Sequence, residues 1–224
     1  MAVKRIFITI VTFATLISCS NSSDFETGEI KAIQMLRETI NARKTPTTIL
    51  DVRKIVTRKK IDKAKIPVLF IELQNGQNGT LTRYPGHGVG ETWLGADGAT
   101  ITLENGKIKA TRGMRNDLMG STSSMPLWSD INETSEYTRK ISYLGGDNKT
   151  YFKTFSCIME KHDNQSSITI FDVQFETQEF LEVCINSKEK FENIYFIDDK
   201  NVVRRSKQYH GQAIGYLTIE RLDR

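Results

Sequence analysis

The sequence predicts a mainly β protein, an antiparallel β-sandwich or a partly open barrel built of hairpins, with an N-terminal amphipathic helix. Two observations indicate the β fold. From about residue 67 onward, roughly ten or more short segments rich in β-branched and aromatic residues follow one another at spacings near ten residues. Asn-Gly, Asp-Gly and similar turn residues separate several of these segments, which is typical of consecutive hairpins.

The first 18 residues have the character of a secretory signal peptide. Lys4 and Arg5 give a positive start, and the uncharged run from Ile6 to Ile17 follows. Its twelve residues are too few to cross a hydrocarbon core of about 30 Å. The polar residues that come next have no stop-transfer character, so a cleaved signal is expected rather than a transmembrane helix.

Leu16-Ile17-Ser18-Cys19 resembles a bacterial lipobox. The resemblance implies cleavage after Ser18 and lipid attachment to Cys19, and Ser20 in the next position favours transport to the outer membrane. An ordinary signal peptide with an incidental cysteine is the alternative. With the usual lipid chains of a bacterial lipoprotein, the anchor would be effectively permanent.

The mature chain is expected to consist of a lipidated tether over residues 19–28 and a single β-rich domain over residues 29–224. The tether is rich in Ser, Asn, Asp and Gly. The domain should begin with an amphipathic helix over about residues 29–42, because apolar residues recur there at helical spacing, at Ile30, Ile33, Leu36 and Ile40.

A short helical turn over residues 58–64, with Thr57 as N-cap, should lead into a buried strand at residues 68–73. Hairpins are expected after it, with turns at residues 97–98, 105–106, 145–148 and 198–201, and strands at residues 136–144, 150–160, 166–175, 178–186, 192–198, 202–209 and 215–222. Residues 113–135 break this rhythm with mixed Gly, Ser, Asn, Met and Pro. A long loop with little regular structure is predicted there.

The charge balance is close to neutral. The whole chain carries a formal +4, and removal of the signal peptide lowers it to about +2, which does not indicate a nucleic-acid partner. The densest basic group is Arg58-Lys59-Lys60 with Lys63 and Lys65. A solvated helix face is the first interpretation, and contact with anionic lipid or an acidic polysaccharide is the alternative.

Cys157 and Cys184 are an even pair once Cys19 is assigned to lipid, and an exported chain meets an oxidising compartment. A disulfide between them is therefore predicted. Two buried thiols are the alternative, and a catalytic thiol is disfavoured because no Cys-x-x-Cys spacing occurs and neither cysteine has a histidine in a catalytic motif.

The sequence offers no catalytic constellation, so the protein is predicted not to be an enzyme and to need no cofactor. His87, His162 and His210 lack metal-ligand spacing and are interpreted as surface residues, and no metal site is expected. A glycosidase needs two carboxylates about 5–9 Å apart. Four carboxylates beside expected turns are the candidates for such a pair, at Asp97, Glu104, Asp117 and Asp130.

The two tryptophans receive different interpretations. Trp93 lies in a strand pattern and is expected in the core. Trp128 follows Pro126 in the irregular segment and is the better candidate for contact with a partner or a glycan, since aromatic rings stack well on sugars.

Several segments together resemble the YjbF/GfcB family of lipoproteins. They are the lipobox, the strand "IPVLFIEL", the segment "ATRGMRNDLM" at residues 110–119, the cysteine pair, the "F-x-N-x-Y" pattern at Phe191, Asn193 and Tyr195, and the ending with Ser206, Gln208 and Tyr209. The resemblance covers nearly the whole mature chain. Some members have Trp near the end where this chain has Tyr209.

The resemblance implies an outer-membrane lipoprotein that faces the periplasm and takes part in exopolysaccharide or group 4 capsule secretion. It also implies a large outer-membrane β-barrel of the YjbH/GfcD type as partner, with polysaccharide as a further one, and it brings no catalytic residues. Alternatives are a polysaccharide-binding or polysaccharide-modifying protein and a carrier of an apolar ligand, since small barrels can enclose a cavity.

Within the segment at residues 110–119, Arg112 and Asp117 are expected to form an ion pair or to brace a turn. Gly113 is expected to supply a backbone conformation with positive φ, which glycine adopts freely. Bracing of the fold is the first interpretation of this segment, and a contact surface for a partner or glycan is the alternative.

Overall fold

The structure, a computed structural model, describes residues 51–224 except 87, 115 and 146–148. The predicted signal peptide, Cys19, the tether and the helix expected over residues 29–42 lie outside the described residues. Among the residues that are described, no helix is long and apolar enough to cross a membrane.

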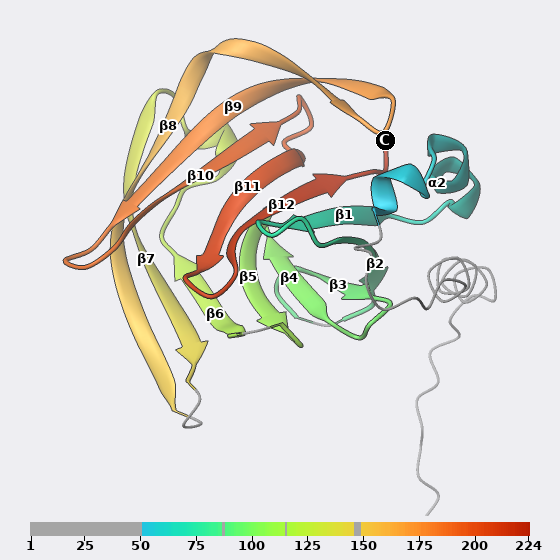
Figure 1. Cartoon of the computed structure of the whole chain (residues 1–224). Coiled ribbons are helices and arrows are strands. Elements are labelled where there is room, and N and C mark those ends of the chain that lie inside the picture. The colour runs from blue at the N-terminus through green and yellow to red at the C-terminus, as the bar shows by residue number, and fades with distance from the viewer. Residues whose placement is uncertain (1–50, 87, 115, 146–148) are drawn as a thin grey trace, which may run out of the picture.

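Twelve antiparallel strands form one sheet, in the order β5-β4-β3-β2-β1-β12-β11-β10-β9-β8-β7-β6 (Figure 1). The strands are β1 (Val68–Leu73), β2 (Asn78–Tyr84), β3 (Glu91–Gly95), β4 (Thr100–Glu104), β5 (Lys107–Arg112), β6 (Leu118–Ser123), β7 (Thr134–Leu144), β8 (Thr150–Ile170), β9 (Val173–Ile185), β10 (Lys190–Ile197), β11 (Val203–Gly211) and β12 (Gly215–Arg221). The mainly β prediction is confirmed.

The sheet curls until its two end strands, β5 and β6, lie beside each other, so the fold is a nearly closed barrel rather than a sandwich. Side chains of β5 bridge this seam. The Leu118 amide donates to Thr111 Oγ1 at 3.0 Å, and Arg112 Nη1 donates to the Leu118 carbonyl at 3.1 Å. No backbone ladder pairs β5 with β6 among the described residues, so these side-chain contacts cover part of the edge that an open sheet would expose.

The short hairpins follow the turn chemistry of the sequence. Asn105 and Gly106 both have positive φ, 50° and 76°, which is the requirement of the two-residue type I′ turn between β4 and β5. Gly98 has φ 88° in the β3–β4 turn. The predicted buried strand at residues 68–73 is β1, whose first four residues are buried.

Two predictions about the strands were wrong. Residues 166–175 were expected to form one strand, but Phe171 and Asp172 have φ 43° and 64° and form the turn between β8 and β9. Residues 166–170 instead continue β8 past the polar run at residues 161–165, where the register with β9 shifts. Residues 113–135 also contain regular structure, β6 and the 3₁₀ helix η2 (Trp128–Asp130).

The side chains pack into two apolar clusters. The larger fills the barrel and includes Trp93, which is fully buried as predicted. The smaller, here called the outer pad, lies on the outer side of β1 and consists of Val52, Val56, Ile61, Val68, Phe70, Ile168, Ile170 and Leu222.

The outer pad is formed where three elements meet the outer side of β1. They are the 3₁₀ helix η1 (Val52–Lys54), the helix α2 (Arg58–Ala64) and the far end of the β8–β9 hairpin. Figure 1 shows β8 and β9 arching over β10, β11 and β12 toward α2. The ring of Phe171 at the hairpin tip meets Phe70 edge-on at 5.6 Å between centroids. Thr57 is the N-cap of α2, as predicted, although its side chain makes no capping hydrogen bond.

Candidate functional site

The carboxylate of Glu182 lies fully buried inside the barrel. The alternating pattern of β9 directs its side chain inward, together with Phe180 and Cys184. Lys107 Nζ of β5 lies 2.7 Å from Glu182 Oε1, and Arg139 Nη1 of β7 lies 3.0 Å from Oε2. A buried charge is tolerated only when it is paired and hydrogen-bonded, and two cations surround this one.

Three neutral groups complete the shell around Glu182. The hydroxyl of Tyr137 and the side-chain amide of Asn193 donate to its two oxygens, and the Tyr195 hydroxyl donates to Oε2 at 2.9 Å. Lys107 also donates to the Tyr137 hydroxyl at 2.9 Å. The carboxylate on β9 therefore accepts from five side chains on β5, β7 and β10. We call these six residues the Glu182 network.

Burial opposes ionisation of Glu182, but Lys107 and Arg139 outweigh it and hold the pKa of the carboxyl well below its usual range. Burial lowers the pKa of Lys107 to about 8, with Glu182 opposing and Arg139 adding to the shift. Burial also raises the pKa of Tyr137. A carboxylate that is ionised and saturated with donors is a poor general base, so this arrangement is suited to holding strands together.

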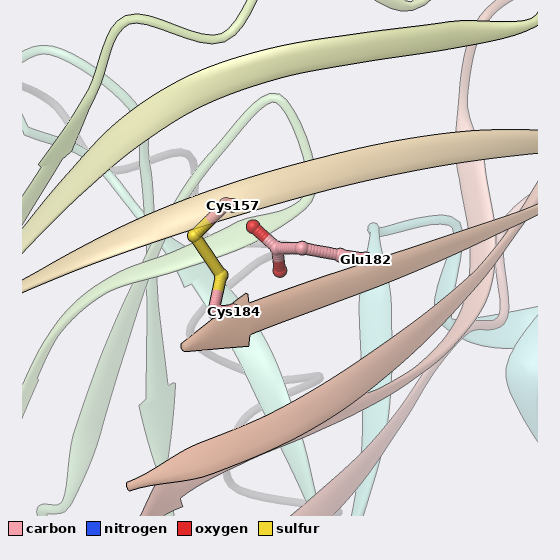
Figure 2. Close-up of side chains that lie close together, drawn as sticks. All are labelled: Cys157, Glu182 and Cys184. Carbon is pink, nitrogen blue, oxygen red and sulfur yellow. A yellow bond between two sulfur atoms is a disulfide. The ribbon is translucent and has the colours of Figure 1, made fainter. Parts of the chain in front are cut away.

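The disulfide Cys157–Cys184 joins β8 to β9 beside Glu182, and Figure 2 shows the carboxylate extending toward the sulfur atoms. The prediction of this disulfide is confirmed in the structure. The two sulfurs and a carboxylate oxygen lie within 4.8 Å of one another. Because the sulfurs are bonded to each other, this group provides no thiolate ligands for a metal ion.

The segment at residues 110–119 forms a braced turn between β5 and β6. Asp117 accepts from the amides of Gly113 at 2.8 Å and Met114 at 3.0 Å, and from the Thr111 hydroxyl at 3.1 Å. Gly113 has φ 79°, as expected. Arg112 donates instead to main-chain carbonyls, including those of Thr111 and Leu118. Of the two roles considered for Arg112 and Asp117, the structure displays turn bracing.

This braced turn stands at the rim of a cavity that has a volume of about 700 Å³. The cavity lies at the end of the barrel that carries the β1–β2, β3–β4, β5–β6 and β11–β12 turns, and we call it the mouth cavity. Apolar side chains line much of it, and its lining includes Val52, Ile71, Leu73, Leu81, Met114 and Ile214. The segment that the sequence singled out therefore borders a concave surface.

Trp128 is buried rather than presented for contact. Its exposed fraction is 6%, and its ring packs against Phe180 and Tyr195 at 5.3 and 5.1 Å between centroids. Its indole N–H donates to the Asn105 carbonyl at 2.9 Å. The indole N–H thus has its hydrogen-bond partner inside the protein. The expectation that this ring would contact a partner or a glycan does not fit its buried position.

The surface interpretation of the histidines was wrong for His210. This residue of β11 is 1% exposed, and its Nε2 lies 2.9 Å from Oγ1 of Thr111 on β5, an end strand of the sheet. Burial lowers the pKa of the imidazole to about 4, with Asp117 opposing. His87 lies outside the described residues, and His162 is partly exposed beside Glu179.

The four candidate carboxylates each have local partners. Asp97 accepts from the Ala99 amide within its turn, Glu104 pairs with Lys109 at 2.9 Å, and Asp130 accepts from Ser129. Asp117 braces the turn described above. Sequence reasoning missed Glu182, although the strict alternation of "QEFLEVCIN" assigns it to the same strand face as Phe180 and Cys184, which was a usable signal.

The fold and these sites define a small barrel with an apolar core, a buried charged network that crosses the interior, and a partly apolar cavity at one end. The chain matches, over residues 33–222, the family described as "Group 4 capsule polysaccharide lipoprotein gfcB, YjbF". It therefore belongs to this family of capsule polysaccharide lipoproteins, and the resemblance noted from the sequence is confirmed.

A solved structure of the hypothetical lipoprotein YmcC from Escherichia coli (K12) has a similar fold. It shares 19% sequence identity with this chain, and the match covers 80% of this chain and 98% of that one with a TM-score of 0.66. No curated protein matches the chain. At this sequence identity the structural similarity supports the fold alone, and the family assignment rests on the match to the family over residues 33–222.

Proposed function

We propose that this protein is a lipoprotein of the outer membrane, anchored through Cys19 and facing the periplasm, that assists export of exopolysaccharide or capsule by docking to an outer-membrane β-barrel. The observation that carries the proposal is the family match, which spans the entire described barrel. The lipobox Leu16-Ile17-Ser18-Cys19 and Ser20 support the anchor and its destination.

The interior of the barrel favours a docking role over a conduit. The Glu182 network crosses the interior, and Trp128 packs inside on Phe180 and Tyr195, so the core is filled. A rigid, filled barrel offers its ends and outer faces for contact. We assign the docking contact to the rim of the mouth cavity, where Met114 and Ile214 are partly buried and border the hollow.

The test is a pull-down of the tagged, lipidated protein from detergent-solubilised outer membranes, with identification of what co-purifies. Stoichiometric recovery of a large β-barrel is expected. The double variant Met114→Lys/Ile214→Lys should lose that partner, while the matched control Ile158→Lys/Ile185→Lys, on exposed outer-face positions of β8 and β9, should keep it. Recovery of the lipoprotein alone, under conditions that keep other outer-membrane complexes intact, would count against docking.

A second candidate function follows from the mouth cavity itself. At about 700 Å³, with apolar side chains in its lining, it falls in the size range of small-molecule sites and could hold an apolar ligand such as an acyl chain. Native mass spectrometry of the protein purified from membranes would detect a bound lipid in addition to the anchor. A Leu73→Glu variant that lost the adduct and kept the β-barrel partner would favour the carrier role.

A further inference from the structure

The net positive charge of the chain is concentrated where the described structure begins. Residues 51–66 contain seven Lys or Arg and two Asp, a net charge of +5, whereas the whole chain carries +4. The remainder is therefore close to neutral. This stretch forms η1 and α2, which sit on the outer pad at one side of the barrel beside the C-terminus (Figure 1).

Two lysines of α2, Lys59 and Lys63, lie on the face of the helix that is turned away from the protein. Ile61 is the buried residue of this helix, at 6% exposure, and it packs in the outer pad. Lys59 and Lys63 are two positions before and after it, about 200° around the helix, and so lie on the opposite face. Both are exposed, and neither makes an ion pair within the part of the chain that the structure describes.

The acidic residues nearby do not neutralise this face. Asp62 is engaged by Arg58 at 2.5 Å and by Arg224 at 3.6 Å, and Asp51 lies 3.4 Å from Lys54. Lys65, which ends the helix, is also exposed and has no ion pair among the described residues. We call Lys59, Lys63 and Lys65 the α2 basic face.

The position of this face relative to the lipid anchor identifies its partner. Only the 31 residues between Cys19 and Asp51 separate the anchor from η1. Such a segment spans at most about 100 Å when fully extended. η1 and α2, the first elements of the described residues, therefore lie within that reach of the bilayer, and they carry the excess cations.

We propose that the α2 basic face docks on the surface of a bilayer that contains anionic phospholipid, and thereby holds the barrel in a fixed orientation on its membrane. This inference rests on the proposed lipid anchoring at Cys19. Each lysine near an anionic bilayer surface favours docking by about fivefold, and an acyl anchor combined with a basic patch is a recurrent pairing. The β9–β10 turn lies at the far end of β9 from α2 (Figure 1), so docking through α2 directs this turn away from the bilayer.

The test uses the full lipidated protein reconstituted into vesicles of phosphatidylcholine alone or of phosphatidylcholine with phosphatidylglycerol. A membrane-impermeant amine reagent labels the lysines, and mass spectrometry gives the labelling rates of Lys59 and Lys63 relative to Lys188, an exposed residue of the β9–β10 turn. We expect labelling to be at least about fivefold slower in the anionic vesicles, and high salt to abolish the difference.

The variant Lys59→Glu/Lys63→Glu should lose the dependence on anionic lipid as read at Lys65. The control Lys140→Glu/Lys207→Glu, at exposed positions of β7 and β11 and with the same change in net charge, keeps the reference Lys188 and should retain the dependence. Equal labelling in both vesicles would overturn the proposal. Protection by a soluble acidic polysaccharide but not by anionic vesicles would also overturn it and assign the face to glycan. Flotation of the protein with phosphatidylcholine vesicles tests the anchor separately, so failure of anchoring and failure of docking are distinguishable.

Discussion

Lys107 on β5 reaches across the inside of the barrel to Glu182 on β9, with 2.7 Å between Nζ and Oε1. β5 is an end strand of the sheet, so this ion pair connects the seam to the far wall. Gln208 of β11 adds a second connection, because it accepts from the Ile108 amide and donates to the Gly106 carbonyl, each at 2.8 Å. The closed shape therefore depends on polar side chains in the interior as well as on β-ladders.

Glu182→Gln should destabilise the protein by about 3–5 kcal/mol, because it leaves Lys107 and Arg139 buried without their counter-ion. The free energy of unfolding from urea titration followed by circular dichroism measures this. Glu176→Gln, at an exposed position of the same strand, should change it by less than about 0.5 kcal/mol. A similar small effect at both positions would show that the network contributes little.

His210 should make stability fall between about pH 6.5 and pH 4. Burial lowers its pKa in the folded state to about 4, so the unfolded chain binds a proton in this range that the folded protein does not. Acidification therefore favours unfolding, by up to about 3 kcal/mol from this residue.

The measurement is the urea midpoint as a function of pH for the wild type and for His210→Gln, which should have a flatter profile in this range. His162→Gln, at a partly exposed site, is the control and should keep the wild-type slope. If His210→Gln kept the full slope, the acid sensitivity would come from other groups.

Removal of the disulfide through Cys157→Ala/Cys184→Ala should cost roughly 3.5 kcal/mol in the chain-entropy account for a separation of 27 residues. The cysteines are 1% and 0% exposed, so reductant should reach the bond only after unfolding. Alkylation of the reduced thiols, followed by mass spectrometry with and without urea, measures this access. Rapid reduction of the folded protein would contradict the burial of the bond.

Asp117→Ala should lower the free energy of unfolding by about 1–3 kcal/mol, because the amides of Gly113 and Met114 and the Thr111 hydroxyl lose a shared acceptor. Thermal melts measure the effect, and Asp163→Ala, at an exposed position of β8, is the matched control.

Polysaccharide output of cells that carry Arg112→Ala separates bracing from binding in the same segment. Arg112 donates to the Leu118 and Met119 carbonyls across the seam and to the Thr111 carbonyl on its own strand, so some loss of stability is expected in either case. If the rim of the mouth cavity is a contact surface, output should fall even when the amount of folded lipoprotein is unchanged. Reduced stability with normal output would leave the segment a purely structural brace.

Local patterns were enough to predict much of the fold. The turns at Asp97-Gly98 and Asn105-Gly106 require φ > 0, which these residue types adopt readily, so the hairpins could be placed from the sequence. Phe171 could not be placed in this way. An aromatic residue at φ 43° contradicts local preference, and its packing on Phe70, about 100 positions away, accompanies that conformation.

The site depended more on contacts between distant residues. Three buried side chains look ordinary in sequence, and each finds its hydrogen-bond partner on or beside β5. Trp128 bonds to Asn105, His210 to Thr111, and Glu182 to Lys107. Closure of the barrel decides which polar groups are buried, and a sequence that permits both a sandwich and a barrel does not specify closure. The braced turn at Asp117 was predictable because all its partners lie within seven residues.

The pairing of β1 with β12 has a consequence for the order of events during synthesis. Phe70 lies opposite Glu220, so the first strand obtains its second neighbour only when almost the whole chain has emerged. Until then β1 is an edge strand of the β1–β5 meander, and contacts at such long sequence separation form slowly. A newly made chain thus remains unclosed until its last seven-residue strand is available. The export and the lipid attachment at Cys19 that we propose would meet an unclosed barrel throughout that interval.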